Sequence, residues 1–200
     1  MTSNTCAFHV NPGKFLNNQI GKTQIMTQHL VLSVLSSYSP QLIVKLSKAV
    51  HDCNANIIES RMTSLGTELS ILIFLSGSWD TIAKLEGILP KLESDLDVKI
   101  TRKRTNKSHP NNKGMPYAIE IVCSDRTGVI HDVTRFFIEN QINIYDMHTN
   151  TYVATQTEST MFSMHMLISI PSDSSISSIR SDFMDFCEQL NFDAIMEPAK

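Results

Sequence analysis

The chain has 200 residues, of which 42 % are hydrophobic and 18 % charged, and its formal net charge is −3. That length accommodates one large or two small globular domains. Because a surface that grips nucleic acid normally carries a basic excess, the negative balance argues against direct nucleic-acid binding.

No apolar stretch has the length of a membrane span, and the N-terminus lacks the apolar core of a signal peptide. The four cysteines (Cys6, Cys53, Cys123 and Cys187) form no C-x-x-C pair. The last three have apolar neighbours, which indicates buried thiols in a reducing compartment. We therefore expect a cytoplasmic protein with no membrane association.

The first 104 residues contain an arm and one folded unit. Residues 1–27 are rich in Asn, Gln, Thr and Ser without periodicity, which predicts a flexible N-terminal arm. Residues 28–104 show strand and helix periods in turn. The predicted elements are a strand over 29–35, a helix from Pro40, strands over 57–64 and 68–75 joined at Gly66, a helix capped by Ser78, and a strand through Leu96, Val98 and Ile100. Pro90 should end or distort the second helix.

A basic cluster follows. Five Lys and Arg residues lie between Thr101 and Gly114, among Asn, Ser, His and Pro. No aromatic residues are interleaved for base stacking, so a solvated linker over 105–114 is a better interpretation than a phosphate-binding segment.

The same unit then repeats at an offset of 87 residues, over residues 115–198. Apolar strand and helix positions and an Asn-Ile step all coincide at this single offset, which indicates an internal duplication. The aligned positions are Leu30, Leu32 and Val34 with Tyr117, Ile119 and Ile121; Leu42, Ile43, Leu46, Ala49 and Val50 with Val129, Ile130, Val133, Phe136 and Phe137; and Asn56-Ile57 with Asn143-Ile144.

Each half therefore has the element order βαββαβ, the ferredoxin-like plan, and the fold class is α+β with two such units in tandem. The two helices of this plan cover one sheet face. The other face needs cover, which favours packing of the halves on each other or on a second chain, so we expect a homo-oligomer.

A polar loop separates a strand from a helix at residues 124–128. Gly128 has no Cβ, so a small anionic or polar ligand could approach the free N–H groups at the start of the helix. Asp125 could cap that helix or hold the amine of a ligand. An ordinary glycine-containing helix start explains the same residues about equally well.

Enzyme signatures are missing. The chain has no G-x-S-x-G, P-loop or H-E-x-x-H motif. His148 and His165 lie on consecutive predicted strands and are expected to face each other across the ladder, but no third ligand has a convincing spacing. We therefore predict no metal, no cofactor and no catalytic residue.

Taken together, the two βαββαβ units, the D-R-x-G loop and the Asn-Ile step resemble tandem ACT domains. Leu65–Glu68, Leu75–Trp79 and Arg102–Thr105 further resemble the family of glycine cleavage system repressors. This resemblance implies a non-enzymatic regulator that responds to a small amino acid such as glycine. It also implies action through a LysR-type transcriptional activator rather than direct DNA binding. The ligand-binding residues it implies are Asp125, Arg126, Thr127, Gly128, Val129, Ile130, Asn143 and Ile144.

The first loop departs from the ACT pattern, because Tyr38 and Gln41 replace the usual Asp and Gly. A ligand is therefore expected at the second loop. Two alternatives stay open: a structural pairing module that has lost its ligand, and an acylphosphatase-like enzyme in which Arg126 and Asn143 hold a phosphate.

Overall fold

The computed structural model describes residues 27–37, 39–106 and 114–199. The chain divides into two compact units, residues 1–107 (the first unit) and 108–200 (the second unit). The predicted arm up to residue 26, Tyr38 in the first loop, and residues 107–113 of the predicted linker lie outside the described residues.

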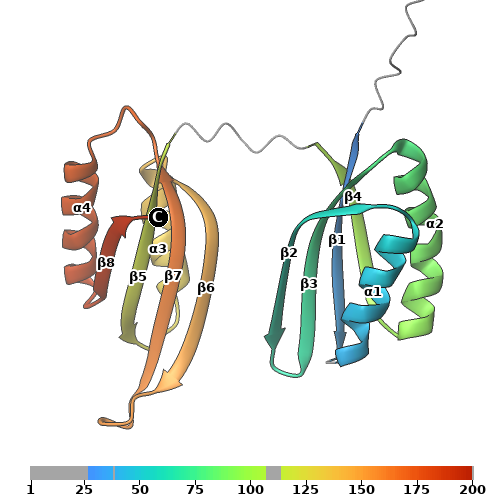
Figure 1. Cartoon of the computed structure of the whole chain (residues 1–200). Coiled ribbons are helices and arrows are strands. Elements are labelled where there is room, and N and C mark those ends of the chain that lie inside the picture. The colour runs from blue at the N-terminus through green and yellow to red at the C-terminus, as the bar shows by residue number, and fades with distance from the viewer. Residues whose placement is uncertain (1–26, 38, 107–113, 200) are drawn as a thin grey trace, which may run out of the picture. The chain divides into compact units, whose positions relative to one another are not determined.

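The first unit is a four-stranded antiparallel sheet with two helices on one face (Figure 1). The strand order across the sheet is β2-β3-β1-β4, so β1 is paired on both sides. Alternate residues of β1 (Leu30, Leu32 and Val34) are fully buried against the helices, while the residues between them face away. The elements are β1 (Gln28–Ser37), α1 (Pro40–Asp52), β2 (Asn56–Leu65), β3 (Glu68–Gly77), α2 (Trp79–Leu96) and β4 (Lys99–Thr105).

The second unit repeats this architecture, with the strand order β6-β7-β5-β8. Both units are therefore βαββαβ, and the predicted α+β fold of two ferredoxin-like units is confirmed. The elements are β5 (Met115–Ser124), α3 (Val129–Glu139), β6 (Asn143–Val153), β7 (Thr160–Ile170), α4 (Ile176–Gln189) and β8 (Asp193–Pro198).

The two cores differ in composition. The core of the first unit is aliphatic, whereas that of the second unit contains a cluster of phenylalanines between α3 and α4. The ring centroids of Phe137 and Phe183 lie 5.1 Å apart, and those of Phe136 and Phe186 lie 4.9 Å apart. Aromatic pairs at such distances add about 0.5–1.5 kcal/mol beyond the area they bury.

Two residues of the predicted helical stripes are not part of the cores. Ile43 is 43 % exposed and Ile130 is 40 % exposed, although the preceding Leu42 and Val129 are buried. Successive helix residues point about 100° apart, because one turn takes 3.6 residues. When Leu42 or Val129 faces the sheet, the next residue therefore points to the side, and Ile43 and Ile130 remain partly exposed.

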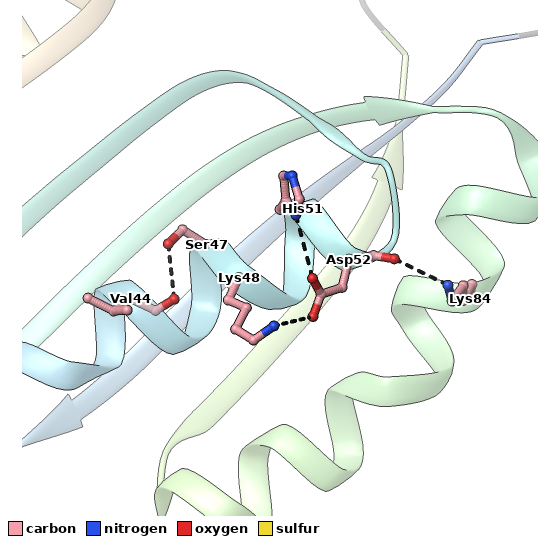
Figure 2. Close-up of polar contacts among 6 residues, drawn as sticks. All are labelled: Val44, Ser47, Lys48, His51, Asp52 and Lys84. Atoms are coloured by element: carbon pink, nitrogen blue, oxygen red, sulfur yellow. Dashed lines mark hydrogen bonds and ion pairs between the residues drawn. The ribbon is translucent and has the colours of Figure 1, made fainter.

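A polar cluster holds the C-terminal end of α1 (Figure 2). The Lys84 ammonium on α2 donates a hydrogen bond to the carbonyl oxygen of Asp52 (3.2 Å). Lys48 forms an ion pair with the Asp52 carboxylate at 2.9 Å, and His51 Nδ1 lies 3.5 Å from the same carboxylate. The hydrogen bond from Lys48 lowers the pKa of Asp52. Since these groups are exposed, the cluster joins α1 to α2 without forming an enclosed site.

The end of the first unit differs from the sequence prediction. Leu96 is the last residue of α2 rather than part of the final strand, and Asp97 ends that helix in the left-handed region with φ of 51°. The basic residues Arg102 and Arg104 lie within β4, so this part of the basic cluster belongs to the first unit. The Arg104 guanidinium lies 2.6 Å from the Glu86 carboxylate of α2, and this hydrogen bond lowers the pKa of Glu86.

Pro90 neither ends nor interrupts α2, which runs from Trp79 to Leu96 around it. The prediction of a helix end at this residue is wrong. A proline cannot donate to the carbonyl four residues earlier, here that of Glu86, and its ring crowds that carbonyl. The buried side chains of Ile82, Leu85 and Leu89 hold the helix on the sheet despite this local cost.

Replacing Pro90 with Ala is therefore expected to stabilise the first unit. The side chain is exposed, so no packing is lost, and the helix gains a hydrogen bond. We expect an increase of about 1–3 kcal/mol in the free energy of unfolding, reduced by a few tenths because the unfolded chain becomes more flexible. Urea denaturation followed by circular dichroism measures the change. An unchanged or lower midpoint would contradict the prediction.

Candidate functional site

The loop between β5 and α3 has the backbone shape that only glycine adopts easily. Gly128 is the N-cap of α3 and has φ of 91°. The side chain of Asp125 does not cap the helix, so that expectation is wrong, and its N–H donates instead to the Thr160 carbonyl of β7 (3.0 Å). A Cβ added at Gly128 would meet only the Asp132 carboxylate, at 3.9 Å. The start of α3 is thus open to solvent but already faces a carboxylate.

The charged side chains of this loop satisfy one another. Arg126 Nη2 donates to Asp132 Oδ2 at 3.2 Å, and Nη1 donates to the Thr127 carbonyl at 3.3 Å. The guanidinium carbon lies 5.2 Å from the ring centroid of Phe192, at the start of β8. An anionic ligand at this loop would therefore compete with Asp132 for both the arginine and the helix N-terminus.

The eight predicted site residues are not all brought together within the second unit. Asp125 to Ile130 form one loop and helix start, with Val129 buried. Asn143 pairs with Ser169, and Ser169 also pairs with Pro116 at the beginning of β5. The loop follows Ser124, at the other end of the same strand, about 26 Å away at 3.3 Å per residue. Asn143 and Ile144 consequently lie at the far end of the sheet from the loop.

At the far end, Asn143 lines a hollow of about 370 Å³ together with Tyr145, Ser169 and Asp173, among others. This hollow is open to solvent and contains no strongly basic side chain. It does not complete the loop site.

The first unit is built differently at the equivalent position. At the offset of 87, Arg126, Gly128 and Asp132 correspond to Ser39, Gln41 and Lys45. A cavity of about 270 Å³ lies there, between the start of α1 and the turn that joins α2 to β4. Its lining residues are Ser36, Ser37, Ser39, Gln41, Leu42, Lys45, Asp95, Leu96, Asp97 and Val98.

Two replacements account for the cavity. The sheet register pairs Ile100 with Val34 in the first unit and Ala194 with Ile121 in the second, so Val98 corresponds to Phe192. In the second unit Arg126 and Phe192 occupy the space beside the start of the helix. In the first unit the smaller Ser39 and Val98 stand at these positions and line the cavity.

Charges of both signs line this cavity. Lys45 on α1 lines this cavity together with Asp95 in the last turn of α2 and Asp97, the residue that ends α2. A cation and carboxylates around one small space are complementary to the two charged ends of an amino acid. Sequence inspection missed this set, because the aspartates lie some fifty residues after the loop and only the fold brings them to it.

The two predicted facing histidines do face each other. The rings of His148 on β6 and His165 on β7 stack with centroids 4.8 Å apart and planes 11° apart. Nδ1 of His165 lies 3.5 Å from a carboxylate oxygen of Glu120 on β5. Within the described residues no group of three or more metal-ligating side chains has a geometry suited to a metal ion.

The thiols of the described cysteines are poor nucleophiles. Cys53, Cys123 and Cys187 are free and buried. Burial raises the pKa of Cys187 to about 12 and also raises the pKa of Cys123. At neutral pH both are therefore held as thiols, whereas nucleophilic chemistry requires the thiolate.

Comparison with known proteins identifies the class. Residues 28–103 match the family model of the ACT domain. The second unit repeats the same element order and strand order, so the chain has an ACT domain followed by a second unit of the same fold. None of the described helices is both long and apolar enough to cross a membrane.

Over 84 % of its length the chain is similar to the glycine cleavage system transcriptional repressors of Escherichia coli (strain K12) and Shigella flexneri. It is 26 % identical to each and covers 88 % of each. Two solved structures share the fold. One, provisionally assigned as a glycine cleavage system transcriptional repressor, has a TM-score of 0.66, 23 % identity, and coverage of 88 % of this chain and 99 % of that chain. The other, an unknown protein from Galdieria sulphuraria, has a TM-score of 0.69, 22 % identity, and coverage of 87 % and 99 %.

The backbone conformation of Gly128 leads to a matched pair of substitutions. Gly128→Ala should lower the free energy of unfolding by about 1 kcal/mol, because alanine is strained at a positive φ. Gly87→Ala should raise it by about 0.5–1 kcal/mol, since Gly87 lies inside α2 with open space around it. The chemical change is the same in both, so effects on the unfolded chain cancel. Equal shifts in the urea midpoint would show that the loop is not strained.

Proposed function

We propose that this protein is an amino-acid-responsive transcriptional regulator of the glycine-cleavage repressor type, which acts through a protein partner. The observation that carries the proposal is the similarity to the two named repressors, which covers both units and nearly the whole length of each relative. The relatives are named as regulators, and the described chemistry of the thiols and histidines supplies no catalytic group. We therefore propose a protein without enzymatic activity that works in the cytoplasm, where its partner would act.

The ligand we propose is a small amino acid such as glycine, held at the loop of residues 125–130. Gly128 leaves room for a carboxylate near the first N–H groups of α3, and Arg126 is 41 % exposed. Asn143 and Ile144 lie at the far end of the sheet, so they would contribute to such a site only from a second copy.

A second candidate site for the same ligand is the cavity beside Lys45. It is favoured by one specific observation: a lysine and two aspartates line it, whereas Arg126 and Asp132 of the second unit already pair with each other. The first loop lacks the usual Asp and Gly of the ACT pattern. The adjacent cavity nevertheless makes it a candidate ligand site.

The proposed partner is a LysR-type transcriptional activator, and direct DNA contact is not part of the proposal. The strands of the second unit contain no Lys or Arg, so its sheet offers no cation to a phosphate backbone. The net charge of −3 agrees with this.

Of the two alternatives, the acylphosphatase-like enzyme is disfavoured by the positions of its two proposed phosphate-binding residues. An acylphosphatase-like reaction needs Arg126 and Asn143 on one phosphate, and the two lie at opposite ends of one sheet in the second unit. The ligand-free pairing module remains the alternative that experiment must separate from an amino-acid sensor.

Calorimetric titration with glycine, serine and other small amino acids tests the ligand and locates its site. With a ligand at the second loop, Gly128→Val should lower affinity about ten- to a hundredfold, and Lys45→Met should leave it unchanged. The loss follows from blocking a charge-assisted hydrogen bond to the backbone. The opposite pattern would assign the ligand to the cavity of the first unit. Absence of binding to the unmodified protein would support the pairing module.

Affinity capture from the native cytoplasm tests the partner. The full chain should retain a LysR-type activator, and addition of the amino acid found by calorimetry should reduce the amount retained at least several-fold. The variant that abolishes binding in calorimetry is the matched control, since it should retain the activator whether or not the amino acid is present. Failure to retain any LysR-type protein would contradict partner-mediated action.

A further inference from the structure

Each unit has one sheet face that its own helices do not cover, here called its open face. It is formed by the alternate strand residues that point away from the buried core. On the first unit the charged members of this face are Arg61, Lys99, Lys103, Glu59 and Glu68. On the second unit they are Glu120, Asp146, Asp193 and Glu197.

The two open faces carry opposite charge. The first has three cations and two anions, a formal charge of +1, and one of the cations, Arg61, is paired with Glu59 at 3.3 Å. The second has four anions and no Lys or Arg, a formal charge of −4 with its histidines neutral. Contact between two first-unit faces or two second-unit faces would therefore be repulsive, and contact between unlike faces attractive.

The opposite charges occupy equivalent positions of the duplicated sheet. Lys103 pairs with Val31, and its counterpart Glu197 pairs with Ala118, the residue 87 positions later. Lys99 and Asp193 are related in the same way through Leu35 and Val122. Lys99 lies 3.7 Å from Glu93 of α2 but is 80 % exposed, so its ammonium remains accessible at the sheet edge.

Exposed apolar side chains lie between these charges on both faces. Leu35 and Leu72 are 50 % and 47 % exposed on the first face, and Leu167 and Ile195 are 37 % and 56 % exposed on the second. Apolar residues flanked by charged ones are the usual composition of a protein–protein interface. The geometry of these faces thus fits a protein surface better than a small ligand.

We propose that the open face of the first unit docks on the open face of the second unit in another copy of this chain. In a twofold dimer this contact occurs twice, so all four open faces are covered and the assembly is closed. Four strands about 4.8 Å apart and seven residues long give a face of about 19 by 23 Å. Four such faces bury roughly 1,700 Å², within the range of stable interfaces.

Complementary charge reversal tests the pairing, with mass measured by analytical ultracentrifugation at low salt. One double variant, Lys99→Glu with Lys103→Glu, makes both faces negative. The other, Asp193→Lys with Glu197→Lys, raises the formal charge of the second face from −4 to 0 and leaves the first face positive. Each alone should dimerise at least a hundredfold more weakly than the parent. Their equimolar mixture should form a dimer, because the negative second face of one variant meets the positive first face of the other. In the reciprocal contact the new glutamates meet the new lysines at positions 193 and 197. The parent dimer should weaken as salt is added.

Matched controls make the same charge changes on exposed helix positions. Lys48→Glu with Lys91→Glu, and Asp185→Lys with Glu188→Lys, should dimerise like the parent. If a reversed variant fails to fold by circular dichroism, Lys99→Gln with Lys103→Gln replaces it and should weaken dimerisation at least tenfold.

Three results would overturn the proposal. The first is a parent protein that remains monomeric at tens of micromolar in the ultracentrifuge. Pairing of unlike faces within a single chain would give the same result. The second is a pair of reversed variants that dimerise like the parent. The third is a mixture that shows no recovery.

Discussion

The structure depends on the burial of one face of a central strand, β1 in the first unit and β5 in the second. Leu30, Leu32 and Val34, like Ile119 and Ile121, are at most 1 % exposed. Each such side chain contributes about 1.5–3 kcal/mol when it leaves water. Because these strands pair on both sides, they fix the registers of β3 and β4, and of β7 and β8. The loops that follow β1 and β5 are therefore positioned by these paired strands, beside the starts of α1 and α3.

The duplicated loops show how one architecture can lead to two kinds of surface. In the second unit, Arg126 pairs with Asp132 and lies over the ring of Phe192, so the charged groups beside the start of α3 are partnered within the chain. In the first unit the shorter Ser39 and Val98 stand at the positions of Arg126 and Phe192, and a cavity lies beside Lys45.

The open faces diverged in a different respect. Their strands keep the same registers and the same apolar alternation, yet the charge at equivalent edge positions is reversed between β4 and β8. Core packing constrains the buried residues of each strand and leaves the outward residues free to change. This freedom allows a duplicated unit to acquire a surface that complements its own copy.

The sequence by itself determined the class of fold, because apolar periods of two and of 3.6 residues are written into each strand and helix and recur at one offset. It also singled out Gly128 for its missing Cβ, and the structure shows that this residue has a positive φ. It did not determine the course of α2, since burial of Leu85 and Leu89 outweighs the local effect of Pro90. Only the tertiary structure separated Asn143 from the loop of residues 125–130 and brought Asp95 and Asp97 to Lys45. The physical reason is that local patterns specify elements, whereas sites form where sheet pairing places residues that are distant in the sequence.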